Sequence, residues 1–263
     1  MNILFIGDIV GRPGRSAVRE ILPNLIKENQ IDFVIANGEN LASGSGLTLS
    51  TYEEMIKIGI DYFTSGNHVW SKKDFIKYLD EEDIKVIRPA NYPDSVPGKG
   101  YCEIKINDKK IIIINLLGRV FLSSEVDNPF KVVNKVIDSL PKNESQIIIV
   151  DFHAEATSEK VCLGQYLDGR VAAVIGTHTH IPTADARILP HGTAYLTDAG
   201  MVGALNSSIG VELKPVLNHF LTGMPVTFDI PKQGEKIFSA ALLKINDKTN
   251  KVINIELIKK IIR

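Results

Sequence analysis

Residues 176–180 read Gly-Thr-His-Thr-His and directly follow a short apolar run. In an extended segment, residues two apart point to the same side, so the imidazoles of His178 and His180 can converge on one place. Converging imidazoles are common metal ligands. Taken alone, the pair is equally compatible with two histidines on an irregular loop that bind nothing. The choice therefore depends on the rest of the chain.

Four other apolar runs also end in side chains that suit metal ions. Each run is short and continuous, which is typical of strands in a parallel sheet that is covered on both faces. The carboxyl ends of such strands border the crevice in which open α/β sheets bind ligands. The polar residues at these ends are Asp8, Glu39 with Asn40, Asn67 with His68, and His153. We therefore predict one site built from five strand ends.

The donor set of this site indicates which ions it would hold. The candidate ligands are Asp8, Glu39, Asn40, Asn67, His153, His178 and His180. They are too many for one tetrahedral zinc ion and include no thiolate, which favours two first-row ions with mixed nitrogen and oxygen coordination. Two ions about 3.5 to 4 Å apart need a bridging carboxylate, for which Glu39 is the natural candidate. Such a pair can bind a phosphate ester, lower the pKa of a bridging water and stabilise the attacking and leaving oxygens.

The elements expected around these strand ends alternate between strand and helix in the first third of the chain. One helix is predicted to begin near Pro13, with a kink or an early stop at Pro23, and another to run from Ser71 to about Glu82. This alternation indicates βαβ units and a parallel sheet with right-handed crossovers. The Gly-rich loop Ala42–Gly46 could approach a phosphate through its N–H groups, but without a fixed spacing motif we expect a flexible connection.

The pattern changes after residue 100. Tyr101–Ile106 and Ile111–Leu117, with the turn signal Asn107-Asp108 between them, predict an antiparallel hairpin, so the sheets must be mixed. Val226–Ile230 is one of several further predicted strands. No linker, repeat or low-complexity segment interrupts residues 1–263, which we expect to form a single domain. The layout predicts an α/β fold of two packed mixed sheets with helices outside.

The composition, 44% hydrophobic and 23% charged, is that of an ordinary globular protein. A net charge of -1 gives no sign of a nucleic-acid footprint, so long polyanions are not favoured partners. The N-terminus enters a strand directly, and no apolar run reaches the roughly 18 residues of a membrane span. Cys102 and Cys162 lack the spacing of a disulfide framework or a zinc knuckle. We expect a soluble cytoplasmic protein that does not span a membrane.

Three blocks of the sequence resemble those of the calcineurin-like metallophosphoesterases: residues 7–11 (Gly-Asp-x-x-Gly), 66–68 (Gly-Asn-His) and 176–180 (Gly-x-His-x-His), with His153 between the last two. Within that superfamily, the chain resembles the YmdB-like bacterial proteins over nearly its whole length. Residues 37–40 (Asn-Gly-Glu-Asn) and the highly specific block 151–160 (Asp-Phe-His-Ala-Glu-Ala-Thr-Ser-Glu-Lys) carry that match. The wider superfamily usually opens with Asp-x-His and bridges its metals with Asp. This sequence has Val10 and Glu39 there, as the YmdB-like group does.

The resemblance implies a four-layer αββα sandwich of two mixed β-sheets flanked by helices, and a site with two ions, iron or manganese. Carried over by position, one ion would be held by Asp8, Glu39, Asn40 and His180, and the other by Glu39, Asn67, His153 and His178. Asn40 would supply the ligand that the missing histidine provides elsewhere. His68, beside a ligand but not itself one, would lie near the leaving oxygen as general acid or phosphate anchor.

The activity implied by the resemblance is hydrolysis of phosphodiester bonds, with 2',3'- or 3',5'-cyclic nucleotides as leading substrates. Two alternatives stay open: a phosphomonoesterase or nucleotidase on the same metals, and a metal-binding scaffold without turnover, against which the full ligand set and His68 argue. Asp151 could support a histidine ligand or cap a turn. His191 and His219 are expected to be structural or exposed. The oligomeric state, including a homo-oligomer, is open.

Overall fold

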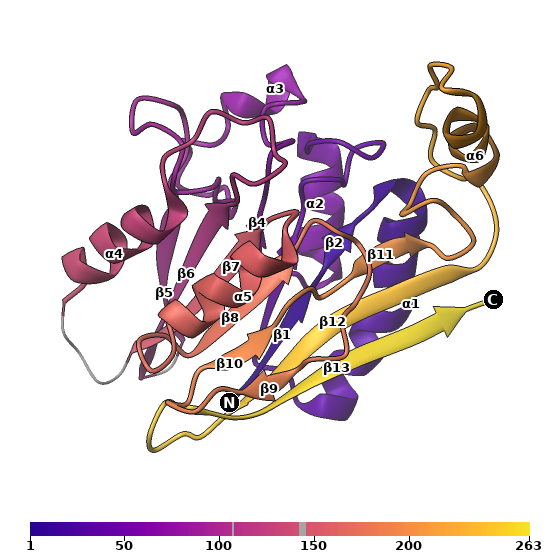
Figure 1. The fold of residues 1–263 in the computed structure, drawn as a ribbon. Coiled ribbons are helices and arrows are strands. Elements are labelled where there is room, and N and C mark those ends of the chain that lie inside the picture. Colours follow the sequence, from indigo (N-terminus) through magenta and orange to yellow (C-terminus); the bar gives the residue numbers. More distant parts are fainter. Residues whose placement is uncertain (107, 142–145) are drawn as a thin grey trace.

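The computed structural model of the protein describes residues 1–106, 108–141 and 146–263. Two mixed β-sheets pack face to face, and helices cover their outer surfaces (Figure 1). The helices of the described residues are α1 (Gly11–Asn29), α2 (Leu49–Ile58), α3 (Lys73–Ile76), α4 (Pro129–Ser139), α5 (Thr157–Tyr166) and α6 (Leu213–Thr222). Within this part of the chain, no helix is long and apolar enough to cross a membrane.

The first sheet joins the two ends of the chain. Its strands are β1 (Asn2–Ile6), β2 (Asp8–Ile9), β3 (Phe33–Asn37), β4 (Tyr62–Thr64), β11 (Met201–Ala204), β12 (Lys236–Ile245) and β13 (Val252–Ile262). β1 pairs in parallel with β3 and antiparallel with β12, and β3 pairs in parallel with β4. The N-terminal βαβ units predicted from the sequence are therefore present, and late strands complete the same sheet.

The second sheet is formed by the middle of the chain. Its strands are β5 (Tyr101–Ile106), β6 (Lys109–Leu117), β7 (Gln146–His153), β8 (Ala173–Thr177), β9 (Arg187–Ile188) and β10 (Ala194–Leu196). β5 and β6 form the predicted antiparallel hairpin, although Asn107 of its expected turn lies outside the described residues. β6, β7, β8 and β10 pair in parallel, so this sheet is mixed as well.

Side-chain alternation along the central strands explains the four layers. On β1, Leu4 belongs to the core under α1 and α2, while Phe5 belongs to the core between the sheets. On β7, Ile149 faces the other sheet and Val150 the core shared with α4 and α5. Because successive strand residues point to opposite faces, an apolar strand of this kind must be covered on both sides. This arrangement confirms the predicted αββα sandwich.

Two local predictions were wrong, and of the two alternatives predicted at Pro23, a kink or an early stop, the stop does not occur. α1 runs through Pro23 without a stop, because that residue lies on the exposed side of a helix whose other face, including Leu22, packs on the first sheet. α3 ends at Ile76 and gives way to turns well before Glu82. Val226–Ile230 forms no strand, because β12 already pairs with β1, β11 and β13.

Candidate metal centre

All the strand ends singled out in the sequence lie beside one cleft, and they come from both sheets. Asp8 begins β2, Glu39 and Asn40 follow β3, and Asn67 and His68 follow β4. β7 ends in His153, and β8 is followed by His178 and His180. Of these residues, Glu39, Asn40, His68, His178 and His180 line the cleft. The site thus combines residues from both sheets of the sandwich. Strand pairing within one sheet would not have predicted this.

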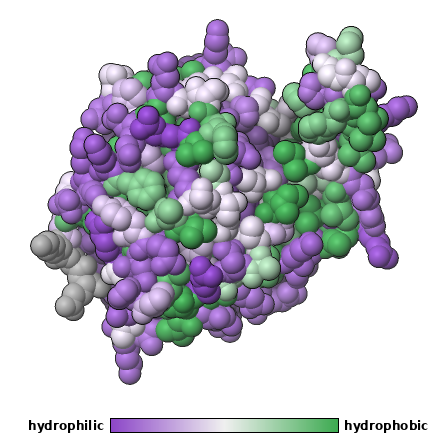
Figure 2. All heavy atoms as spheres, in the orientation of Figure 1, coloured by the Kyte–Doolittle hydropathy of each residue, from purple (hydrophilic) through white to green (hydrophobic). Residues whose placement is uncertain are grey.

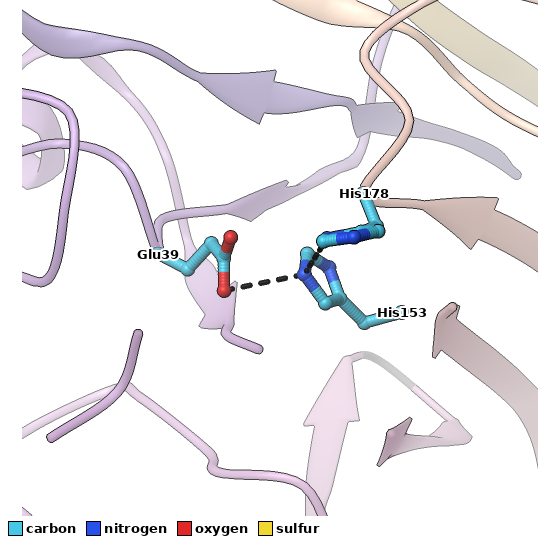
Figure 3. A group of neighbouring side chains, drawn as sticks. All are labelled: Glu39, His153 and His178. Carbon is cyan, nitrogen blue, oxygen red and sulfur yellow. Dashed lines mark hydrogen bonds and ion pairs between the residues drawn. The ribbon is translucent and has the colours of Figure 1, made fainter. Parts of the chain in front are cut away.

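The centre of the cluster is formed by Glu39, His153 and His178, whose ligand atoms all lie within 4.8 Å of one another (Figure 3). His153 Nε2 lies 3.2 Å from Glu39 Oε2 and 3.0 Å from His178 Nδ1. His153 and Glu39 are buried, and His178 lies at the cleft surface. One carboxylate and two imidazoles at this spacing match the donor types that first-row metal ions prefer.

Asp8 connects this cluster to His180. Asp8 Oδ1 lies 3.7 Å from His153 Nδ1 and 4.0 Å from His180 Nε2, while Oδ2 accepts a hydrogen bond from the His178 N–H at 3.0 Å. The other ring nitrogen of His180, Nδ1, lies 2.7 Å from the carbonyl oxygen of Ile209. A proton on Nδ1 that bonds this carbonyl leaves the lone pair on Nε2, the atom that faces Asp8.

Buried oxygens without hydrogen-bond donors show whether the site suits cations. Among the described residues, four buried side-chain polar atoms have no hydrogen-bonding partner, and three are oxygens of predicted ligands: Asp8 Oδ1, Asn40 Oδ1 and Asn67 Oδ1. The fourth is the nitrogen Asn115 Nδ2, which a cation would not bind. A buried polar oxygen without a partner is costly, and a bound metal ion offsets that cost. The residues present therefore fit the predicted metal site.

The loop Ala42–Gly46 orients one of these oxygens. Its N–H groups at Ala42, Gly44, Ser45 and Gly46 bond carbonyl oxygens within residues 39–46, so they are not free to hold a phosphate. The Gly44 carbonyl accepts a hydrogen bond from Asn40 Nδ2 at 2.9 Å. Because an amide has one donor end and one acceptor end, this bond determines which atom of Asn40 is left as a ligand. The loop is thus a compact turn that positions Asn40, not the flexible connection that we expected.

Gly66 is required by the close approach of two candidate ligands, Glu39 and His153. A Cβ atom at this position would lie 2.2 Å from Glu39 Oε2 and 2.4 Å from His153 Nε2. Any other residue would displace both side chains. The same strand end places the His68 N–H 3.1 Å from Glu39 Oε2, while its ring Nδ1 lies 3.3 Å from the Ser71 hydroxyl. If that hydroxyl donates, the proton of a neutral His68 is on Nε2.

The protonation of the three central residues is coupled. Burial alone would raise the pKa of Glu39, but the neighbouring His153 outweighs it and lowers the value to about 2. Burial would lower the pKa of His153, but the Glu39 carboxylate raises it to about 9. Burial, together with the positive charge of His153, lowers the pKa of His178 to about 3. In the metal-free protein, His153 therefore carries the proton and His178 is neutral.

Sequence reasoning left the role of Asp151 undecided, and the structure links it to His153. The Thr177 hydroxyl donates to Asp151 Oδ1 at 2.7 Å and lies 2.8 Å from His153 Nδ1. Burial raises the pKa of Asp151 to about 6. This chain of contacts holds the His153 ring with Nε2 directed at Glu39. The two-residue spacing of Asp151 and His153 on one strand face was the signal in the sequence.

A second supporting group contacts the histidine loop: it contains Lys160, which sequence reasoning did not single out, and Asp198, to which it assigned no role. Lys160 on α5 is buried, and its Nζ lies 2.6 Å from Asp198 Oδ2. The same oxygen accepts hydrogen bonds from the N–H and hydroxyl of Thr179, between the two histidines, at 3.1 and 2.7 Å. Glu155, whose carboxylate lies 3.0 Å from His178 Nε2, was also not singled out. His191 and His219 lie at the surface, bonded to Asp168 and to a backbone carbonyl, as expected.

A cluster of imidazole, carboxylate and amide side chains that could bind metal ions, at the strand ends of an αββα sandwich, defines a phosphoric ester hydrolase of the metallophosphoesterase type. The chain matches the sequence model of the family described as "YmdB-like protein" over residues 4–258. It belongs to the YmdB-like family. It is also 46% identical, over 256 residues, to the 2',3'-cyclic-nucleotide 2'-phosphodiesterase of Bacillus subtilis (strain 168), with 97% of this chain and 96% of that protein covered.

Two solved structures share the whole fold. A hypothetical protein from Thermus thermophilus superimposes with a TM-score of 0.91 at 40% identity, covering 99% of each chain. A structure described as a novel phosphatase from Mycoplasma pneumoniae superimposes with a TM-score of 0.92 at 36% identity, covering 99% of this chain and 93% of the other. These similarities extend over both sheets, so they include every strand end that contributes to the site.

Proposed function

We propose that the protein is a metal-dependent phosphodiesterase that hydrolyses cyclic nucleotides, with 2',3'-cyclic nucleotides as its leading substrates. The observation that carries the proposal is the set of three buried oxygens without donors, on Asp8, Asn40 and Asn67, beside a cluster of histidines. The name of the Bacillus subtilis relative supports the substrate class. Its high identity over nearly the full length of both chains makes this the natural first substrate to test.

We propose two ions per chain, iron or manganese. One would be held by Asp8, Glu39, Asn40 and His180, and the other by Glu39, Asn67, His153 and His178. The absence of cysteine from this set supports a nitrogen and oxygen site over a structural zinc site. When bound, such a pair of ions supplies Lewis-acid stabilisation of a phosphate ester and of the oxygens that attack and leave.

The chain's own residues would position and protonate the substrate. His68 lines the cleft, and its Nδ1 lies 3.3 Å from the Ser71 hydroxyl. As an imidazolium that donates from Nδ1 to this hydroxyl, His68 would give its Nε2 proton to the leaving oxygen of the ester and remain as the neutral imidazole. Thr177 and Asp151 would keep the His153 ring in place, and Lys160 with Asp198 would hold the loop that carries His178 and His180.

The first test is metal content. Purified protein should contain close to two first-row ions per chain, and Asp8→Ala should lower that number while the protein stays folded. Asp247→Ala is a matched control, because Asp247 is an exposed aspartate that pairs with the N-terminus. It should leave the metal content unchanged. A content of one ion in the natural protein, unchanged in Asp8→Ala, would contradict the two-ion assignment.

The second test is a substrate panel of 2',3'-cyclic, 3',5'-cyclic and linear diesters together with monoesters. The description of the Mycoplasma pneumoniae structure as a phosphatase favours a phosphomonoesterase as the second candidate. Preferential hydrolysis of monoesters would establish that candidate in place of the diesterase.

The free state of Cys102 and Cys162 supports our further proposal of a cytoplasmic location. We also propose one domain over residues 1–263, because the site draws residues from both sheets.

A further inference from the structure

The cleft that contains the candidate metal centre has a second, apolar end. The cleft has a volume of about 590 Å³, which is within the range of roughly 300 to 1,000 Å³ for small-ligand sites. Its apolar end is lined by Ile209, Val216, Phe220, Phe228 and Ile230. These residues belong to the α6 arm, which we define as residues 205–235 between β11 and β12. α6 stands apart from the sandwich in Figure 1, and Figure 2 shows apolar residues gathered over it.

Two aromatic rings of the arm are unusually open for apolar side chains beside a reactive site. Phe220 is 78% exposed and Phe228 is 65% exposed, so neither ring is used to fill a core. On α6, Phe220 lies one turn after Val216, which also lines the cleft. Exposed aromatic rings at the end of a ligand cleft are suited to stacking a planar group, which gains attraction beyond simple apolar burial.

The arm is tied to the metal centre and is held in shape by backbone bonds. His180 Nδ1 contacts the Ile209 carbonyl at 2.7 Å, so a candidate ligand and the start of the apolar wall share one hydrogen bond. The Glu212 N–H donates to the Asp229 carbonyl at 2.8 Å, which brings the beginning of α6 next to the segment that carries Phe228. A ligand bound at the candidate metal centre would therefore contact the apolar residues of the arm at a fixed position.

We propose that the apolar end of the cleft is the nucleobase subsite of the enzyme, with Phe220 and Phe228 as the rings on which the base stacks. This inference rests on the proposed function, because a phosphate at the candidate metals directs the rest of a nucleotide along the same cleft. Apolar side chains contact the face of a base and form few hydrogen bonds with its polar edges. Stacking of this kind tolerates every base, so purine and pyrimidine cyclic nucleotides should all be accepted.

The test compares two esters that differ only in the base: adenosine 2',3'-cyclic phosphate and methyl ribofuranoside 2',3'-cyclic phosphate. Phe220→Ala and Phe228→Ala should each lower kcat/KM for the nucleotide, mainly through KM, by about 5- to 100-fold, the usual range for loss of one stacking face. Neither variant should change kcat/KM for the ester without a base. Phe→Trp at the same positions should retain activity on the nucleotide.

Leu221→Ala is the matched control. Leu221 is the next residue on the same helix and is 76% exposed, but it does not line the cleft. It should leave kcat/KM for both esters unchanged. Binding provides an independent readout: adenosine should give saturation-transfer NMR signals with the metal-free protein, and the double variant Phe220→Ala, Phe228→Ala should abolish them.

The outcomes separate this inference from the proposed function. Equal losses on both esters, or no loss on either, would overturn the subsite while leaving the phosphodiesterase intact. If the natural protein hydrolyses neither ester, the proposed function fails, and adenosine binding still decides the subsite. If Phe220→Ala and Leu221→Ala both turn a dimer into a monomer without any discrimination between the esters, a second copy of the chain covers this face and the subsite is wrong.

Discussion

The contact between Glu39 and His153 predicts a pH dependence that can be measured on the metal-free protein. Burial alone would lower the pKa of His153, but Glu39 at 3.2 Å raises it from 6.5 to about 9. A group whose pKa is raised on folding stabilises the folded state fully below its unfolded pKa and loses that contribution as the pH rises through the folded pKa. Since one pKa unit corresponds to about 1.4 kcal/mol, this group should remove about 3 kcal/mol from the free energy of unfolding between pH 6.5 and pH 9.

The variant Glu39→Gln isolates this effect. Without the carboxylate, the pKa of His153 should fall toward 6.5, because burial is then opposed only by the weaker effects of Asp8 and Asp151. The pH-dependent loss should shrink from about 3 kcal/mol to below about 1 kcal/mol. Glu39 itself does not titrate in this window, because His153 lowers its pKa to about 2 against burial, so its own contribution is lost only as the pH falls below 4.5.

The assay is denaturant unfolding in EDTA at pH 6.5, 7.5 and 9, combined with NMR titration of the histidine side chains. Glu155→Gln is the matched control, since it removes a carboxylate that contacts His178 instead of His153. It should keep the dependence of the natural protein. An unfolding free energy that does not change between pH 6.5 and pH 9, or the same dependence in Glu39→Gln, would refute the assignment of the proton to His153.

Four further predictions test the rest of the site. A ligating imidazole must be neutral, so metal affinity should rise with pH up to about 9 as His153 loses its proton, by about tenfold per pH unit. Chelator competition measures this affinity, and full occupancy at pH 5 would count against ligation by His153. His68→Asn should keep the ions and lower kcat about 100- to 10,000-fold on diesters with poor leaving groups, with a much smaller loss on a nitrophenyl diester; equal losses would exclude the acid role. Lys160→Met should lower the free energy of unfolding by about 3 to 5 kcal/mol because it leaves Asp198 as an unpaired buried charge, and adding Asp198→Asn should recover part of that loss. Gly66→Ala should lower metal content and activity together, because the added methyl overlaps two candidate ligands; normal metal content would show that the site tolerates the displacement.

Local patterns were sufficient for the strand ends because each candidate ligand directly follows a buried run. The carboxyl ends of parallel strands lie at one edge of a sheet, so Glu39 and Asn67, after neighbouring strands β3 and β4, had to be close. Local patterns were insufficient where several conformations had similar local preferences. Pro23 did not end α1, because tertiary packing of the opposite face outweighs one lost hydrogen bond. Val226–Ile230 had strand propensity but forms no strand, and β12, the next strand along the chain, is already paired on both sides, with β1 and β11 on one and β13 on the other.

The sequence by itself determined the kind of chemistry, since residue type sets the donor atoms, and the strand periodicity sets the end at which each donor lies. Only the tertiary structure decided how those donors are tuned. His153 keeps its proton because the Glu39 carboxylate, from far earlier in the chain, lies beside it. The side-chain oxygen of Asn40 is left without a donor because its nitrogen donates to the Gly44 carbonyl. The apolar wall lies beside the ligands because His180 bonds to Ile209. Protonation and orientation depend on distances and burial between segments remote in sequence, and no local pattern encodes these quantities.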